Sequence, residues 1–126
     1  MDTNYKVAVA LIVGIAIGGV GTHGLHAQAK PKGYVITESE IIDQEAWKEY
    51  APKAAEANKA LGGQYLVRGG KIAALEGEPP KRVTISVYDS FEQAQASRTS
   101  EVRKAFASLR AKALKTRSYI VEGLAN

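Results

Sequence analysis

The feature that most limits the fold is an uncharged N-terminal run of 14 residues, Val7–Val20, which contains only apolar residues and glycines. Its length matches the apolar part of a secretory signal, whereas a membrane-spanning helix needs about 20 residues. Ala27-Gln28-Ala29 follows as the small-x-small pattern that signal peptidase accepts. We therefore expect residues 1–29 to be a signal peptide cleaved after Ala29, and the protein to be periplasmic or secreted.

The main alternative for this segment is an uncleaved anchor. The run could extend to Leu25, and Gly14 and Gly18 form a GxxxG pattern that packs membrane helices. The domain would then be anchored in the inner membrane and face the periplasm. The segment Gly19–Gly24 matches the dinucleotide-binding pattern GxGxxG, but only six residues could form a helix before Pro31, so we do not expect a dinucleotide site.

The residue inventory excludes several kinds of site. The chain has no cysteine, and both histidines, His23 and His26, precede the expected cleavage point. We therefore expect no metal and no cofactor in the mature domain, because zinc sites, histidine-ligated haem and His-dependent nucleophiles need residues that it lacks. The net charge is +4, with basic and acidic residues interspersed, which is typical of a solvated surface rather than a nucleic-acid-binding one.

Residues 30–32 form a linker, and residues 33–123 form the domain. Within the domain, apolar residues recur at strand spacing in some segments and at helical spacing in others. Alternation predicts strands at 34–41, 64–68, 82–88 and 118–122, with 71–76 as the return strand of a hairpin around Gly69-Gly70. In 82–88, Val83, Ile85 and Val87 face one side and Arg82, Thr84, Ser86 and Tyr88 the other.

Helical spacing predicts two helices. The first begins after the N-cap Asp43, buries Trp47 and Tyr50, and ends at Gly62-Gly63. Pro52 predicts a kink or a restart within it. The second begins at Ser90 and continues from Ser100. A buried stripe is expected there at Val102, Phe106, Leu109 and Ala113, with Arg103, Lys104, Arg110 and Lys112 outside it.

This order of elements, βαββαβ with an extra β-hairpin, predicts an α+β ferredoxin-like sandwich. Its sheet is antiparallel, and both helices pack on one face because each crossover connection is right-handed. The other face is left uncovered. We therefore expect that face to be either a pairing surface or the wall of a pocket.

Several motifs also give the chain a family resemblance. They are Gly33-Tyr34-Val35-Ile36, Asp43 with Trp47 and Tyr50, Gly62-Gly63, Leu66-Val67-Arg68-Gly69-Gly70, Leu75-Glu76-Gly77, Arg82-Val83, Ser100-Glu101 and Ile120-Val121-Glu122-Gly123. With these the chain resembles the bacterial domain of unknown function 1330 family, of the dimeric α/β-barrel superfamily, over about residues 33–123. It departs from the family pattern at Val102 and Trp47, where members have aromatic residues and tyrosine, respectively.

The resemblance implies a homodimer in which two sheets face each other around a central barrel. It implies no reaction, because the superfamily includes cofactor-independent monooxygenases, haem-degrading enzymes and ligand binders, and a fold alone does not choose among these functions.

Five polar side chains are candidates for binding a small-molecule ligand: Glu38, Arg68, Thr84, Ser86 and Tyr88. Arg68 is the foremost, because a guanidinium at a strand end can hold a carboxylate bidentately. The simpler interpretation is an Arg–Glu pair that closes the barrel or the dimer rim. Two functions therefore stay open: a non-catalytic dimer that binds a small organic molecule or a partner protein, and a cofactor-independent, monooxygenase- or isomerase-like enzyme that uses Glu38, Arg68 or Tyr88.

Overall fold

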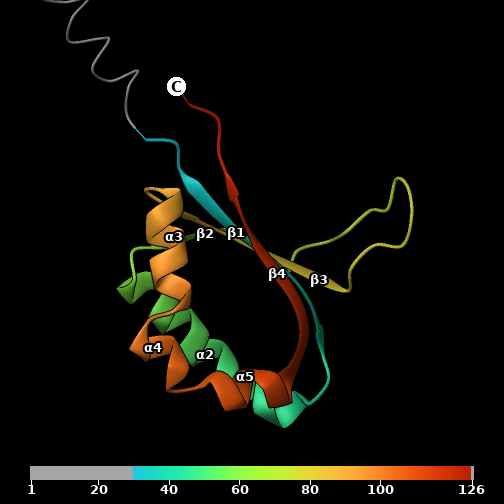
Figure 1. The fold of residues 1–126 in the computed structure, drawn as a ribbon. Coiled ribbons are helices and arrows are strands. Elements are labelled where there is room, and N and C mark those ends of the chain that lie inside the picture. The colour runs from blue at the N-terminus through green and yellow to red at the C-terminus, as the bar shows by residue number, and fades with distance from the viewer. Residues whose placement is uncertain (1–29, 126) are drawn as a thin grey trace, which may run out of the picture. The chain divides into compact units, whose positions relative to one another are not determined.

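The fold is built on a four-stranded antiparallel sheet in the order β2-β3-β1-β4. The structure, a computed structural model, describes residues 30–125, and the domain comprises Pro31–Leu124. The strands are β1 (Gly33–Ile41), β2 (Gln64–Arg68), β3 (Arg82–Tyr88) and β4 (Leu114–Glu122), and the helices are α2 (Gln44–Ala60), α3 (Phe91–Arg98), α4 (Glu101–Lys104) and α5 (Ala107–Ala113). The helices lie together on one side of the sheet (Figure 1), which confirms the predicted ferredoxin-like arrangement.

Helix α2 begins and ends where its capping residues predict. Asp43 Oδ1 accepts a hydrogen bond from the Ala46 amide at 3.0 Å, and Gly62 follows the helix with a φ of 89°. The helix continues through Pro52 as one element, so the predicted restart does not occur. Proline removes one backbone hydrogen bond, and the buried side chains of Tyr50 and Ala57 on either side hold the helix together.

The second helical region is more broken than its spacing predicts. Beyond Ser100 it forms two short helices, α4 and α5, and Phe106 between them is not helical, with a φ of −125°. This break brings the Phe106 ring edge-on to Tyr50, with 5.8 Å between the ring centroids. Val102, which was expected in the buried stripe, is 46% exposed.

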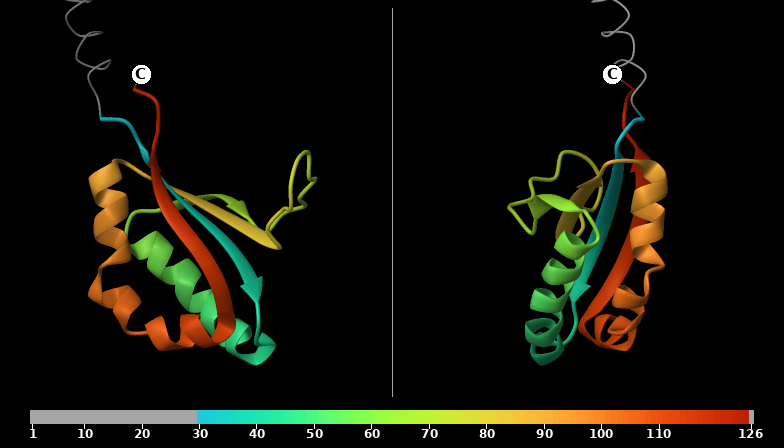
Figure 2. Two further views of the ribbon diagram at one scale, coloured as in Figure 1. Left: turned by 45° about the vertical axis from the view of Figure 1, so that its right-hand side comes forward. Right: turned by 90° about the vertical axis from the view of Figure 1, so that its left-hand side faces the viewer.

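The predicted hairpin after β2 does not form. No strand is present between Gly69 and Lys81, and β2 pairs with β3 instead. The Gly69 amide still donates to the Val83 carbonyl at 2.9 Å, and then the chain leaves the sheet as a loop that projects from the domain (Figure 2). Lys, Ala and Glu are weak strand formers, so Lys71–Glu76 does not compete with β3 for the edge of β2.

The apolar core is small and divided into two clusters. One joins α2 to the end of α5 and the start of β4 through Ala46, Tyr50, Ala113 and Leu114. The other joins the sheet to α3 through Val35, Tyr88 and Ala94. Within residues 30–125, no helix has the length and apolarity needed to cross a membrane. The predicted signal and its cleavage at Ala29 lie outside the described residues.

Candidate functional site

The two faces of the sheet have opposite chemistry. The helix-facing side of β1 and β3 carries hydroxyls, namely Thr37, Ser39, Thr84 and Ser86. The side without helices carries apolar residues, namely Tyr34, Ile36, Val83, Ile85, Val87, Tyr119 and Val121, and charged residues toward one end of β1 and β4, namely Glu38, Glu40, Lys115 and Arg117. The space between sheet and helices, where a two-layer domain usually places its apolar core, is therefore partly polar.

A cavity of about 60 Å³ lies in this space, and we call it the interlayer cavity. Five arginines line it, one from each of five elements: Arg68 (β2), Arg82 (β3), Arg98 (α3), Arg103 (α4) and Arg110 (α5). They are five of the six arginines of the chain. Among the described residues that line the cavity, none is an aspartate or a glutamate.

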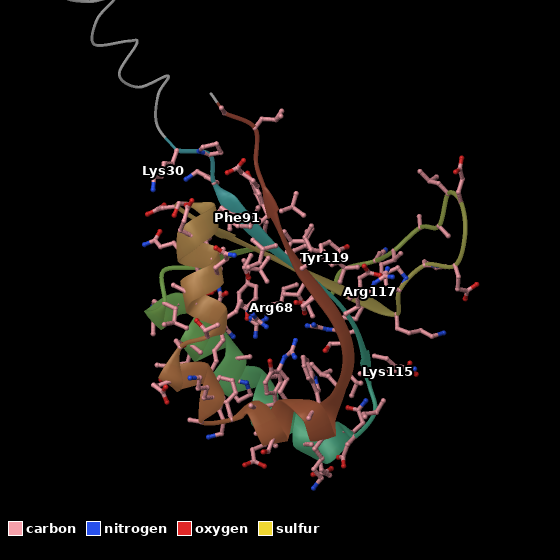
Figure 3. The ribbon with its side chains drawn as sticks, viewed as in Figure 1. Lys30, Arg68, Phe91, Lys115, Arg117 and Tyr119 are labelled. Atoms are coloured by element: carbon pink, nitrogen blue, oxygen red, sulfur yellow. The ribbon has the colours of Figure 1, made fainter. Side chains whose placement is uncertain are left out.

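The sheet-side arginines are held by aromatic rings. The Arg82 guanidinium lies over the Trp47 ring at 4.7 Å and donates from Nη1 to Thr84 Oγ1 at 2.8 Å. The Arg68 guanidinium lies over the Tyr65 ring at 4.8 Å. Gly69 makes room for Arg82, because a Cβ at that position would lie 2.8 Å from Arg82 Nε. In Figure 3 the Arg68 side chain points into the space between the helices and the sheet.

The helix-side arginines are held by neutral acceptors. Arg103 donates from Nε to the Ser97 carbonyl at 3.1 Å and from Nη2 to the Tyr88 hydroxyl at 3.3 Å. Arg110 Nη2 donates to Ser118 Oγ at 3.2 Å. Each of these guanidiniums keeps donors for a ligand, because the group carries five N–H donors in total.

Electrostatic strain is concentrated at Arg98. Burial, together with repulsion from Arg103 and Arg110, lowers the pKa of Arg98 to about 10. Burial, and then repulsion from Arg68, also lowers the pKa of Arg82. Both shifts mean that the site disfavours its own positive charge, and a bound anion would remove that penalty.

One buried hydroxyl in the cavity has no hydrogen-bond partner. Ser39 is 5% exposed, and its Oγ is the one buried side-chain polar atom without a partner among the residues that the structure describes. Buried polar groups are nearly always hydrogen-bonded, so an orphaned hydroxyl indicates a missing partner such as a ligand or water. The cavity can therefore offer an acid both guanidinium and hydroxyl donors.

An adjoining hollow of about 360 Å³ shares Tyr50, Arg98, Arg103, Arg110 and Leu114 with the interlayer cavity. We call it the outer hollow. Its remaining lining is mainly apolar, from Phe106, Ala107 and Ala111, with Lys104 and Thr116. The three helix-side arginines thus line both spaces.

Comparison with known proteins identifies the family. The family described as domain of unknown function (DUF1330) matches residues 32–124. The chain belongs to the DUF1330 family. No curated protein matches it.

Solved structures resemble this DUF1330 domain in fold. The crystal structure of RPA0582, a protein of unknown function from Rhodopseudomonas palustris, is 17% identical, with a TM-score of 0.62 over 82% of this chain and 91% of that one. The structure of methylated RPA0582 is also 17% identical, with a TM-score of 0.60 over 82% and 89%. At this identity the match establishes the α+β fold of the domain and nothing about its ligand.

The DUF1330 domain brings together three of the five candidate residues. Arg68, Thr84 and Ser86 line the interlayer cavity. Tyr88 is 2% exposed, donates to Asn58 Oδ1 at 3.1 Å and accepts from Arg103, so it holds α2 and α4 to the sheet from outside the cavity lining.

Glu38 does not share a pocket with Arg68, which corrects the expectation that the five residues converge. It lies on the sheet face without helices, opposite Arg117 in the strand register. There it accepts from Arg117 Nη2 at 2.8 Å and from the Tyr119 hydroxyl at 2.8 Å. The Arg–Glu pair of this domain is therefore Arg117–Glu38 rather than one made by Arg68. Arg117 and Tyr119 lie on β4 away from the helices (Figure 3).

Sequence reasoning missed Arg82, Arg98, Arg103 and Arg110 as site residues. Helical spacing placed Arg103 and Arg110 outside the buried stripe, whereas both line the interlayer cavity. The break at Phe106 turns α4 and α5 separately, so one continuous helical wheel does not apply to them. One signal was available: Arg98, Arg103 and Arg110 follow one another at short spacing, with Glu101 as the one acidic residue between them.

Proposed function

We propose that this DUF1330 domain binds a small organic acid in the interlayer cavity. The observation that carries the proposal is the convergence of five arginines, from five elements, on one cavity whose described lining contains no carboxylate. Charged side chains are rarely withdrawn from water unless they are paired with an opposite charge, and these arginines, four of them partly buried, are held by hydroxyls, a backbone carbonyl and aromatic rings. A carboxylate ligand would supply the missing partner.

Arginine suits this role better than lysine. Its planar guanidinium binds a carboxylate through two parallel hydrogen bonds, and it tolerates loss of water better than an ammonium group does. The ten lysines among residues 30–125 are distributed differently, since none of them lines the interlayer cavity. Selective use of arginine in the cavity supports recognition of a planar acid group.

The proposal is tested by thermal shift and calorimetry with sodium salts of acetate, benzoate, succinate and phosphate at constant ionic strength. An organic acid is expected to raise the midpoint of unfolding of the wild-type protein. Arg98→Met should abolish the increase, while the matched control Arg117→Met, which removes a guanidinium on the opposite sheet face, should retain it. If no organic acid stabilises the wild type at millimolar concentration, the proposal is wrong.

A second proposal concerns the partner: we infer that two copies pair through the sheet faces that carry no helices. The apolar side chains of that face support it, because Tyr119 and Val121 are 42% and 45% exposed in a single domain. A contiguous exposed apolar patch is typical of a protein–protein interface. Analytical ultracentrifugation should find a dimer, and Ile85→Lys, at the centre of the face, should convert it to a monomer. A wild type that is monomeric at 100 µM would refute this inference.

The cellular location of the protein is the subject of a third proposal. We infer that residues 1–29 direct export, that cleavage after Ala29 releases the domain, and that retention of the segment would leave it anchored in the inner membrane. The uncharged run Val7–Val20 and the following cleavage pattern support this. The intact mass of the native protein, together with cell fractionation, tests it. A cytoplasmic protein that retains Met1 would contradict it.

A further inference from the structure

We propose that the bound acid carries two separated carboxylates, one held by Arg68 and Arg82 on the sheet and the other by the helix-side arginines. This inference rests on the proposed function, and it adds the class of ligand. The class is a short linear dicarboxylate, which differs from a monocarboxylate and from a compact anion such as phosphate.

The five arginines form two groups by position. Arg68 ends β2 and Arg82 begins β3, and Thr84 lies opposite Arg68 in the strand register. The other group, Arg98, Arg103 and Arg110, comes from the three short helices that cover the sheet. The repulsion that lowers the pKa of Arg98 comes from Arg103 and Arg110, in the helix-side group. The repulsion that lowers the pKa of Arg82 comes from Arg68, in the sheet-side group.

Each group has donors free for an acid. On the sheet side, Arg82 uses Nη1 for Thr84, and Arg68 is placed by its contact with the Tyr65 ring. On the helix side, Arg103 and Arg110 bind neutral oxygens, and among residues 30–125 no hydrogen-bond acceptor is assigned to Arg98. One carboxylate offers about four lone-pair sites, which is fewer than the N–H donors that the five guanidiniums present together.

The dimensions of the two spaces favour a ligand with an acid group at each end. The interlayer cavity, at about 60 Å³, is the smaller of the two spaces, so it suits the acid group at one end of a longer ligand. Arg68 and Arg82 line this inner space, whereas the helix-side group lines both it and the outer hollow of about 360 Å³. A ligand whose acid group reaches Arg68 and Arg82 therefore extends from the interlayer cavity into the outer hollow, past the helix-side arginines.

Charge balance points the same way. A monocarboxylate would leave four of the five guanidinium charges without a counter-charge, and withdrawal of unpaired charge from water is costly. A second carboxylate on the same molecule adds a charge-assisted hydrogen-bonded pair without a second loss of translational freedom.

The test is calorimetric titration of the purified full chain with linear dicarboxylates from malonate to adipate, with monocarboxylates of matched length, and with inorganic phosphate. The best dicarboxylate is expected to bind at least about tenfold more tightly than its matched monocarboxylate. Arg68→Met should remove that advantage by weakening the dicarboxylate more than the matched monocarboxylate, whereas Arg98→Met should weaken both. The Arg68 side chain is exposed, so this substitution is compatible with folding, which circular dichroism verifies.

The outcomes separate the two proposals. Equal binding of mono- and dicarboxylates, or tighter binding of phosphate than of any dicarboxylate, with Arg98→Met still weakening it, would overturn the two-group inference and leave the proposed function standing. An advantage of the dicarboxylate that survives Arg68→Met would also overturn it. No binding of any organic acid would overturn the proposed function itself.

Discussion

Replacing Arg98 with methionine is expected to stabilise the domain in the absence of ligand. One pKa unit corresponds to about 1.4 kcal/mol, so lowering the pKa of Arg98 from its usual value to about 10 opposes the charged side chain by about 3 kcal/mol. Methionine keeps the unbranched stem and removes the charge. The substitution also removes the solvation that the partly buried guanidinium keeps, which offsets part of this gain. We therefore expect the free energy of unfolding to rise by about 1–3 kcal/mol.

The assay is urea denaturation at pH 7 and low salt, with thermal unfolding as a second measure. For a domain of this size, a gain of 1 kcal/mol raises the unfolding midpoint by about 4–8 °C. The lowered pKa also determines how the stabilisation by Arg98→Met changes with pH. A base whose folded pKa is lowered imposes its full penalty below that pKa, and the penalty falls as the pH rises through it. The advantage of Arg98→Met should therefore be constant from pH 6 to 9 and shrink above about pH 10.

A control and a refutation complete this experiment. Arg117→Met removes an exposed guanidinium whose pKa is raised by its hydrogen bond to Glu38, so it should not stabilise the domain. If Arg98→Met lowers stability, or leaves it unchanged, then Arg98 is a packing residue and the argument from uncompensated charge fails. Stabilisation with simultaneous loss of acid binding is the expected pattern for a residue kept for function.

Three further experiments are informative. Ser39→Ala removes the orphaned hydroxyl, so chemical denaturation should find stability unchanged or higher by up to about 1 kcal/mol, and a clear loss would mean that the hydroxyl has a partner. Gly33→Ala places a Cβ 2.6 Å from the Ser90 carbonyl oxygen, so it should lower the free energy of unfolding by about 1–3 kcal/mol. The control Gly70→Ala meets no atom within 4 Å and should be close to neutral. Equal effects of the two substitutions in chemical denaturation would contradict the packing at Gly33. Hydrogen bonds from Arg117 and Tyr119 lower the pKa of Glu38, so wild-type stability should fall as the pH drops below the usual carboxyl pKa. Glu38→Gln should weaken this dependence of stability on pH. The same loss of stability in acid for the variant and the wild type would refute the argument.

Local pattern predicted the elements that depend on neighbouring residues. The alternation in Arg82–Tyr88 predicted β3 and its two faces, and Asp43 and Ser90 predicted the starts of α2 and α3. These signals work because strand alternation and helix capping each involve side chains only a few residues apart. The βαββαβ order followed from them.

Local pattern failed where distant segments compete. Lys71–Glu76 was predicted as a strand, but β3 takes the edge of β2. The helix after Ser100 was predicted as continuous, but it breaks at Phe106, whose ring contacts Tyr50. In both cases a tertiary contact outweighs a weak local preference.

The candidate site divides in the same way. By itself the sequence determined the absence of histidine and cysteine from residues 30–126, the sheet-based fold and the placement of Arg68, Thr84 and Ser86 on strands. The export segment that it predicts lies outside the described residues. Only the tertiary structure decided that Glu38 faces away from them and that arginines from three helices meet the sheet-side pair at one cavity. The physical reason is that periodicity fixes the face of one element, whereas convergence depends on the register between strands and on how five elements far apart in the chain pack together.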